Sequence, residues 1–359
     1  MRLAILGNGG FGTAMAIAQS RRGHAVSLWG HDAAYTAEIA QSRRNPRYLE
    51  GVDVPPAVTV SGDAALVLTG ADAVLVAVPT QHVRTTLSSL RGVLPAVPVV
   101  SLAKGLEQST GLRPSEVIAA VVGDARRVLA LSGPSHAEEI ARGLPTTVVL
   151  AGPAEASVRS LQESLTTPWF RIYRSADLLG LELCGALKNV MALAAGIADG
   201  LGYGDNAKAA ILSRGIVEMT RFGRAAGAEE RTFFGLAGVG DLAVTAFSRH
   251  GRNRAFGERI GRGATLAQAL AASPKVAEGV WTSRVVVERA RARCRDADRD
   301  GGRAGPVRRT ESAGRGARAD GTRPEGRELI GGRQKSRSSV SALPKNANTW
   351  PTENDTDTP

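Results

Sequence analysis

Hydrophobic residues in the first half of the chain fall into short runs of strand length, separated by helical stretches and small-residue turns. The expected strands are residues 2–6, 25–29, 58–60, 73–78, 97–102, 128–131, 147–151 and 170–173. Helical patterns lie between several of them, at residues 64–69, 81–90 and 136–142. Because strand and helix alternate in this way, the pattern predicts an α/β fold with a doubly wound, mostly parallel sheet over about residues 1–178.

From about residue 178 the pattern is entirely helical. Its most apolar segment, LELCGALKNVMALAAGIADGLG at residues 181–202, predicts a helix that is buried on most sides. One charged residue, Lys188, lies inside this segment and is followed by Asn189. Such a lysine either extends its ammonium to water or lies beside a cleft, where desolvation lowers its pKa. Further helices are expected at residues 206–227, 232–236, 266–272 and 280–291.

The first predicted strand runs into the glycine-rich sequence GNGGFG at residues 7–12, which opens a helix. In a strand–turn–helix unit with this spacing, Gly7 permits the tight turn, Gly9 lets the backbone approach a pyrophosphate, and Gly12 lets helix and strand pack closely. The free N–H groups of the helix N-terminus then face the phosphates. The sequence therefore predicts a dinucleotide-binding site at the start of the chain.

The second predicted strand ends in Gly30, His31 and Asp32. NAD-selective sites commonly carry an acidic residue at the end of this strand, where it binds the ribose hydroxyls. Here Gly30 takes that position and Asp32 follows late, so a 2′-phosphate is not excluded and both NAD and NADP stay open. His31 lies either near the adenosine or in an ordinary loop.

Other polar residues directly follow predicted strands. Lys104 follows the strand at residues 97–102, and Gly133 and Ser135 follow the strand at residues 128–131. Ligands of doubly wound sheets bind at the carboxyl ends of the strands, so these residues are expected to meet the glycine-rich turn in one crevice. Lys104 is otherwise a surface lysine, and Ser135 serves equally well as a helix N-cap.

The helical half carries two further candidate segments. Asp241, in the sequence GLAGVGDL, would either cap the following helix or orient a lysine. Arg252 and Asn253, which follow Gly251, place a guanidinium and an amide side by side, an arrangement that suits phosphate recognition. The alternative for this second segment is a solvated basic start of a helix.

Composition narrows the class of protein. The 359 residues are enough for two domains, and two cysteines give no disulfide framework. No signal peptide is expected, and the longest purely apolar runs are too short to span a membrane, so we expect a soluble, cytoplasmic protein without a bound metal. The net charge of +11 invites nucleic-acid binding, but aromatic residues make up only 4% and no reader motif is present.

Eight segments, in one order, resemble the bacterial-type NAD(P)-dependent glycerol-3-phosphate dehydrogenases. They are GNGGFGTA, WGHD, AKGLE, SGPSHAEEIARGLPT, GALKNVMALAAGIADGLGYGDNAKAA, GLAGVGDL, RNRAFG and VAEGVWT. The resemblance covers residues 1 to about 291. It implies hydride transfer between C2 of glycerol 3-phosphate and the nicotinamide of NAD or NADP, which in the reducing direction converts dihydroxyacetone phosphate into the precursor of the glycerophospholipid backbone. A homodimer is a further expectation.

The resemblance also implies roles for individual residues. Lys188 would be the general acid and base, held and tuned by Asp241 and assisted by the charge of Lys104. The substrate contacts would be Lys104, Gly133, Ser135, Lys188, Asp241, Gly251, Arg252 and Asn253. The cofactor contacts would be Gly7, Gly9, Gly10, Phe11, Gly12, His31, Lys104, Ala137, Arg252, Val276 and Glu278.

The chain departs from the family pattern at several positions. Gly10 and Gly251 stand where the family often has serine, so each loses one hydroxyl donor, and His136 replaces a usual phenylalanine in the wall of the crevice. The larger departure follows Arg291, where the family would continue with an apolar, helical finish.

Residues 293–359 are instead rich in Arg, Gly, Asp, Ser and Pro, with Trp350 as their one aromatic residue. Such a segment cannot bury enough apolar surface to offset its ordering entropy, so we expect disorder. We therefore expect a dinucleotide-binding domain at residues 1–178, a helical substrate domain at 179–292 and a disordered tail at 293–359. One hypothesis is a reading frame that shifts near Arg293, and the rival is a basic appendage for an anionic partner.

Two rival functions stay open. One is a related dehydrogenase of another small hydroxy substrate. The other is a catalytically impaired dinucleotide-binding protein that lacks its last helices, whose loss would expose apolar surface on the substrate domain.

Overall fold

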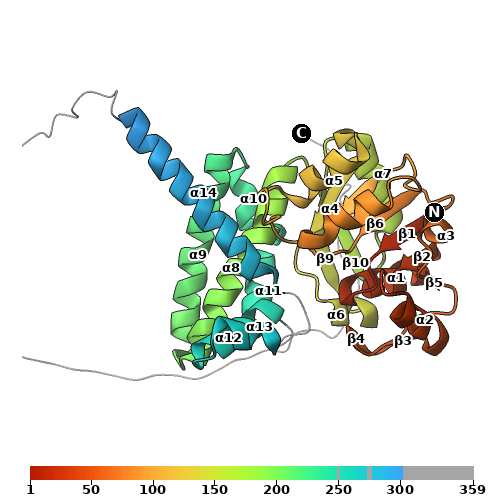
Figure 1. Cartoon of the computed structure of the whole chain (residues 1–359), viewed down its shortest axis with the longest axis horizontal. Coiled ribbons are helices and arrows are strands. Elements are labelled where there is room, and N and C mark those ends of the chain that lie inside the picture. The colour runs from red at the N-terminus through yellow and green to blue at the C-terminus, as the bar shows by residue number, and fades with distance from the viewer. Residues whose placement is uncertain (249–250, 273–276, 302–359) are drawn as a thin grey trace, which may run out of the picture. The chain divides into compact units, whose positions relative to one another are not determined.

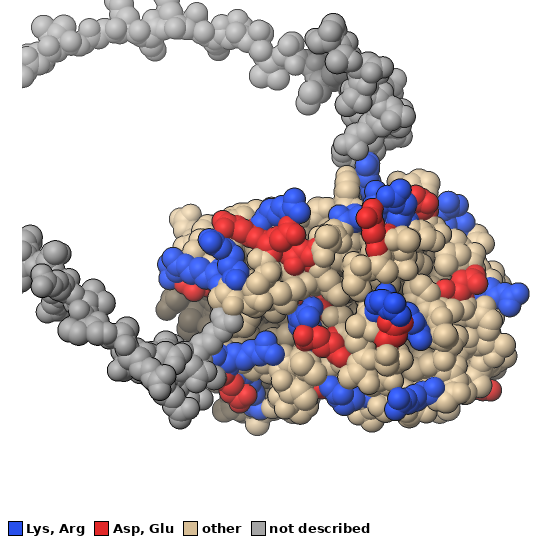
Figure 2. All heavy atoms as spheres, turned by 90° about the horizontal axis from the view of Figure 1, so that it is seen from above, with Lys and Arg blue, Asp and Glu red and all other residues tan. Residues whose placement is uncertain are grey.

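The computed structural model describes residues 1–248, 251–272 and 277–301, and the side chains of these as far as residue 291. The described residues belong to one compact unit. Acidic and basic side chains are interspersed over the face seen in Figure 2, without a large area of one sign.

The N-terminal half is built on an eight-stranded sheet with the strand order β10-β9-β8-β7-β6-β1-β2-β5 (Figure 1). The strands are β1 (Arg2–Leu6), β2 (Ala25–Trp29), β5 (Thr59–Ser61), β6 (Ala73–Val76), β7 (Val99–Ser101), β8 (Val128–Ser132), β9 (Thr146–Ala151) and β10 (Phe170–Ser175). Neighbouring strands are parallel except β8 and β9, which are antiparallel. The predicted doubly wound, mostly parallel sheet is confirmed.

Helices cover both faces of this sheet, because its strands are apolar on both sides. In β1, Leu3 and Ile5 belong to one apolar cluster, whereas Ala4 and Leu6 belong to another. The first cluster includes residues of α1 (Gly10–Arg21), α2 (Ala33–Ser42), α6 (Ala137–Arg142) and α7 (Glu155–Leu165). The second includes residues of α3 (Ala64–Leu68), α4 (Thr80–Ser89) and α5 (Pro114–Val122).

Three elements of this half were not predicted from the sequence as helices: α2, α5 and α7. A short antiparallel hairpin of β3 (Arg44–Asn45) and β4 (Leu49–Asp53) was also not predicted. A 3₁₀ turn, Ala125–Arg127, leads into β8.

The helical half begins at Leu178, just after the last strand of the sheet. Its elements are α8 (Leu178–Gly200), α9 (Gly204–Ala226), α10 (Glu230–Phe234), a π-helical turn (Leu236–Gly240), α11 (Asp241–Phe247), α12 (Arg252–Gly261), α13 (Leu266–Ala271) and α14 (Glu278–Gly301). Helix α14 extends past Arg293, where we expected the disordered tail to begin. The rest of that expectation falls on residues 302–359, outside the described residues.

Helix α8 is the central helix of this half. Asp177 caps its N-terminus by accepting a hydrogen bond from the backbone N–H of Gly180 at 2.7 Å. By length and composition α8 is apolar enough to cross a membrane, but 67% of its most apolar window is buried inside the protein. The core helix of a protein can be equally long and equally apolar without crossing a membrane.

Helices α8 and α12 pack with their backbones unusually close. Glycines one turn apart form the contact on both helices: Gly196 and Gly200 on α8, and Gly257 and Gly261 on α12. A Cβ atom added to Gly196 would lie 2.0 Å from the carbonyl oxygen of Arg254, and one added to Gly257 would lie 2.2 Å from that of Leu193. No larger residue fits these positions unless the two helices separate.

We expect Gly196→Ala to lower the free energy of unfolding by about 2 kcal/mol, because the added methyl group overpacks the contact. Helix propensity alone would raise it by up to about 1 kcal/mol, so the sign of the change decides between the two effects. The measurement is chemical denaturation beside Gly92→Ala, where an added Cβ meets nothing within 4 Å. Unchanged or increased stability of the Gly196 variant would contradict the tight crossing.

Candidate active site

The glycine-rich turn between β1 and α1 has the geometry that a pyrophosphate requires. Gly7 has a φ of +113°, and a Cβ there would lie 2.8 Å from the carbonyl oxygen of Ala77. A Cβ on Gly12 would lie 1.9 Å from the carbonyl oxygen of Gly7, so the start of α1 packs directly on the strand. A Cβ on Gly9 would meet nothing within 4 Å, which leaves the face of the turn open to a ligand. These residues fit a bound dinucleotide.

The loop of the β3–β4 hairpin packs against this turn. The side-chain amide of Asn45 donates to the carbonyl oxygen of Asn8 at 2.8 Å and to the hydroxyl of Thr13 at 2.7 Å. The carbonyl oxygen of Tyr48 lies 2.8 Å from where a Cβ on Gly10 would be. Glycine at position 10, in place of the family's frequent serine, therefore permits a close approach of the hairpin.

The end of β2 offers no free carboxylate. A Cβ on Gly30 would lie 2.1 Å from the side-chain nitrogen of Asn8, so an acidic residue does not fit there. Asp32 caps α2 by accepting from the N–H of Tyr35 at 3.0 Å, and the Arg47 guanidinium lies 3.6 Å from its carboxylate. These interactions lower the pKa of Asp32, with the hydrogen bond from Tyr35 as the largest cause. His31 is exposed beside it.

Two lysines meet at one buried carboxylate near the carboxyl ends of β7 and β8. Lys104 Nζ donates to Asp241 Oδ2 at 2.7 Å, and Lys188 Nζ donates to Asp241 Oδ1 at 2.9 Å. Lys188 Nζ also donates to the hydroxyl of Thr245 at 2.7 Å. Asp241 is 1% exposed and Lys188 is 6% exposed, so the pair is shielded from bulk water. The cluster joins the sheet, through Lys104, to α8 and α11.

Lys104 also orders the loop after β8. Its ammonium donates to the carbonyl oxygen of Gly133 at 2.8 Å and to the hydroxyl of Ser135 at 3.1 Å. The Ser135 hydroxyl in turn donates to Gly133 O at 2.8 Å. The N-cap residue of α6 is His136, so Ser135 does not act as the simple N-cap that the sequence left open.

Burial and charge together tune the site. Burial lowers the pKa of Lys188 to about 8, the attraction of Asp241 opposes this, and the nearby Lys104 and Arg252 add to it. Burial by itself would raise the pKa of Asp241, but the two lysines outweigh it and the pKa is lowered. The arrangement therefore combines a permanent carboxylate with an ammonium that can lose its proton near neutral pH.

The side-chain amides of Asn253 and Asn189 connect α12, α8 and the segment after β7 by hydrogen bonds. The Asn253 side chain donates to Asn189 Oδ1 at 2.9 Å and accepts from the N–H of Gly279 at 3.0 Å. The side chain of Asn189 donates to the carbonyl oxygen of Lys104 at 2.8 Å. Asn253 thus ties α12 to α8 and α14, in addition to any ligand contact that its second amide hydrogen makes.

Arg252 is the first residue of α12, and its side chain is exposed. Its charge favours the neutral amine of Lys188 and the ionised carboxylate of Glu278. Gly251 before it is the N-cap residue, and a Cβ there would lie 2.8 Å from the carbonyl oxygen of Thr245. Glycine at position 251, where the family usually has serine, therefore lies at a close contact with the backbone of α11.

Glu278, at the start of α14, reaches across to α4 of the sheet half. Its Oε1 accepts from the N–H of Thr80 at 2.8 Å. Its Oε2 and the Thr80 hydroxyl are both buried. Burial raises the pKa of Glu278 to about 7. Hydrogen bonding by Thr80 and the charge of Arg252 oppose this rise only in part.

The other expected contacts are placed as follows. Ala137 begins α6, with its Cβ 3.7 Å from where a Cβ on Gly10 would be, and Phe11 is partly buried in α1. His136 is half-buried, and burial followed by the charge of Lys188 lowers its pKa. Val276 lies outside the described residues. The described residues contain no group of His, Cys, Asp and Glu able to hold a metal ion.

Family models described as NAD-dependent glycerol-3-phosphate dehydrogenase N-terminus and C-terminus match residues 2–158 and 177–297. The glycerol-3-phosphate dehydrogenase (NAD(P)+) of Chlorobium limicola is 44% identical over 296 residues, which cover 82% of this chain and 89% of that protein. The chain belongs to the NAD-dependent glycerol-3-phosphate dehydrogenase family.

A second relative and a solved structure agree with this membership. The glycerol-3-phosphate dehydrogenase (NAD(P)+) of Geobacillus kaustophilus is 44% identical over 80% of this chain and 85% of its own length. The crystal structure of glycerol-3-phosphate dehydrogenase from Coxiella burnetii has a TM-score of 0.77 and 35% identity, and the match covers 82% of this chain and 90% of that one. The C-terminal family model stops at residue 297, close to where the composition changes.

The low pKa of Lys188 makes stability depend on pH. The folded pKa of about 8 lies below the ordinary value of 10.5, so unfolding takes up a proton between these values. The free energy of unfolding therefore rises with pH in this window. Relative to Lys188→Met, which lacks the group, we expect the wild type to gain about 2 kcal/mol between about pH 7 and pH 10. If the free energies of unfolding of both proteins change equally with pH, the lowered pKa of Lys188 is contradicted.

Proposed function

We propose that this chain interconverts dihydroxyacetone phosphate and sn-glycerol 3-phosphate with NAD(H) or NADP(H), and so supplies the glycerophospholipid backbone. The observation that carries the proposal is the Asp241 carboxylate that holds Lys104 and Lys188 together at the ligand-binding edge of a dinucleotide-binding sheet. Family membership supports the same reaction, because the relatives are named for it.

Lys188 would act as general acid and base. In the reducing direction a bound nicotinamide would supply the hydride to C2, and the Lys188 ammonium would donate a proton to the ketone oxygen. In the oxidising direction the neutral amine accepts the proton of the alcohol. Asp241 and Thr245 hold the Nζ atom in place, and the lowered pKa keeps both protonation states accessible.

The remaining residues would bind the two ligands. Arg252, which is exposed beside Lys188, would bind the substrate phosphate, with Gly251 and Asn253 next to it. Lys104, Gly133 and Ser135 would line the substrate from the sheet side. The proposed cofactor contacts are Gly7, Gly9, Gly10, Phe11, Gly12, His31, Lys104, Ala137, Arg252, Val276 and Glu278. A homodimer and a cytoplasmic location stay predictions.

The test is nicotinamide absorbance with dihydroxyacetone phosphate, for the wild type, Lys188→Met and the surface control Arg214→Ala. Loss of the acid should lower kcat by about 10³-fold, whereas the control should be unaffected. The reduction rate should fall above about pH 8 and the oxidation rate should rise through it, following the pKa of Lys188.

Two outcomes would favour the rival functions. Turnover of an unphosphorylated hydroxy acid or ketone with equal efficiency would indicate a dehydrogenase of another substrate. Binding of NADH, seen by its fluorescence, without turnover of any of these substrates would indicate an impaired dinucleotide-binding protein.

The end of β2 supports a preference for NADPH. Asp32 is engaged with α2 and Arg47, and Gly30 leaves no room for another acid, so the ribose hydroxyls of NADH lack a carboxylate partner. The Arg47 guanidinium lies 3.9 Å from the centre of the Tyr35 ring, and its neighbour Tyr48 contacts the glycine-rich turn. The Arg47 guanidinium offers positive charge to a 2′-phosphate, and His31 is exposed beside Asp32.

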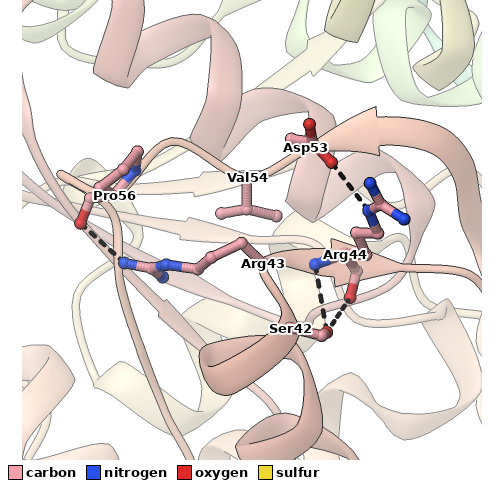
Figure 3. Close-up of a pocket in the computed structure, with 6 residues that line it drawn as sticks. All are labelled: Ser42, Arg43, Arg44, Asp53, Val54 and Pro56. Atoms are coloured by element: carbon pink, nitrogen blue, oxygen red, sulfur yellow. Dashed lines mark hydrogen bonds and ion pairs between the residues drawn. The ribbon is translucent and has the colours of Figure 1, made fainter.

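We therefore expect Arg47→Ala to weaken NADPH binding by about 10-fold and to leave NADH binding within about two-fold. Dissociation constants from calorimetry test this without turnover. The matched control is Arg44→Ala, on the same hairpin, whose guanidinium pairs with Asp53 beside the pocket in Figure 3. Equal losses for both nucleotides, or an equal effect of the control, would contradict the assignment.

A further inference from the structure

A second ionic cluster lies at the C-terminal end of α8, apart from the residues proposed for the site. Asp199 Oδ1 pairs with Lys208 Nζ of α9 at 2.7 Å, and Asp199 Oδ2 pairs with Arg254 Nη1 of α12 at 2.6 Å. The side chains of Asp199 and Arg254 are 16% exposed and that of Lys208 is 10% exposed. Glu258 lies 3.4 Å from the same guanidinium and also pairs with Arg262 at 2.5 Å.

This cluster holds both ends of the connection between α11 and α12. On one side, Arg254 Nε donates to the carbonyl oxygen of Ser248 at 3.1 Å, the same oxygen that accepts from the N–H of Gly251 at 3.3 Å. On the other side, the Lys208 ammonium lies 5.3 Å from the centre of the Phe247 ring, at the end of α11. One carboxylate therefore reaches the last residues of α11 and the first turn of α12, where Arg252 begins the helix.

The glycine contact between α8 and α12 leaves a role for directional bonds between the two helices. Gly196 and Gly257 let the helix backbones touch, but they offer no interlocking side chains that would fix the rotation or the sliding of one helix on the other. The hydrogen bond from Asn253 to Asn189 supplies one such restraint, and the ion pair of Asp199 with Arg254 supplies a second one nearer the C-terminal end of α8.

Asp199 is charged when it does this. Burial opposes its ionisation, but hydrogen bonds from Lys208 and Arg254 outweigh burial and lower its pKa. Loss of the carboxylate would leave the Lys208 ammonium without its partner and facing Arg254, which would keep only the more distant Glu258, and the first turn of α12 would move away from Lys208.

We propose that Asp199 is a positioning residue for recognition of the substrate phosphate. Through Arg254 it fixes the first turn of α12, so that Arg252 faces the Lys188 side of the crevice. This inference rests on the proposed function, which assigns the phosphate to Arg252. Neither Asp199, Lys208 nor Arg254 belongs to the substrate or cofactor contacts proposed above.

The test compares wild type with Asp199→Asn, which keeps the side-chain shape and removes the charge. We expect the KM for dihydroxyacetone phosphate to rise about 10-fold, while kcat and the dissociation constant of NADH change by less than about two-fold. The kcat/KM for dihydroxyacetone, the same ketone without the phosphate, should be unchanged. Asp199→Glu should recover part of the lost affinity, because it restores the charge.

Glu218→Gln is the matched control, since it removes an exposed ion pair with Arg214 on α9 and should change none of these values. Calorimetry with inorganic phosphate gives a readout without turnover, and its dissociation constant should rise in Asp199→Asn in parallel with the KM.

A similar loss of kcat/KM for the phosphorylated and the unphosphorylated ketone would overturn the proposal, because a general structural role predicts it. An unchanged KM and phosphate affinity would overturn it as well. If the wild type does not reduce dihydroxyacetone phosphate, the proposed function fails, and the phosphate affinities of the two proteins still decide whether Asp199 positions the anion site.

Discussion

The buried carboxylate of Asp241 is the constraint on which the site depends. It accepts hydrogen bonds from Lys104 and from Lys188, and without it two ammonium groups would face each other in a region of low dielectric. With it, the charge of Lys104 is compensated, while burial lowers the pKa of Lys188 so that this second lysine can lose its proton. Proton transfer at neutral pH and a stable interior would otherwise be opposing requirements, and this carboxylate reconciles them.

The same bond joins the two halves of the molecule. Lys104 comes from the sheet, and Asp241 comes from the helices. Glu182 of α8 repeats this arrangement, since it accepts from the backbone N–H of Ser115 at 2.7 Å and from Arg113 at 2.8 Å. Glu278 adds a third bond of this kind, to Thr80. Buried carboxylates on the helical side and donors on the sheet side make docking of the halves a condition for assembling the site.

Sequence patterns predicted the fold well where burial is two-sided, as in β1 and β6, and where glycine has a steric reason, as at Gly7 and Gly12. Weakly patterned helices such as α2 and α5, and the β3–β4 hairpin, were missed because their stability comes from tertiary contacts. Thr245 was missed as a site residue, although it follows Asp241 by one helical turn. Arg47 and Thr80 carried no signal, because only the fold brings Arg47 to Asp32 and Tyr35, and Thr80 to Glu278.

Helix α8 has a property that follows from its three charged contacts. Asp177 caps its start, Lys188 lies about three turns later, and Asp199 follows about three turns after that, so the contacts recur on nearly the same side of one rigid rod. The length of the helix thus fixes the distances between the Asp177 cap, the Lys188 amine and the ion pair of Asp199 with Arg254. A substitution along it changes one contact, whereas an inserted or deleted residue turns everything beyond it by about 100°. Evolution can vary the chemistry of this helix but has little freedom to vary its length.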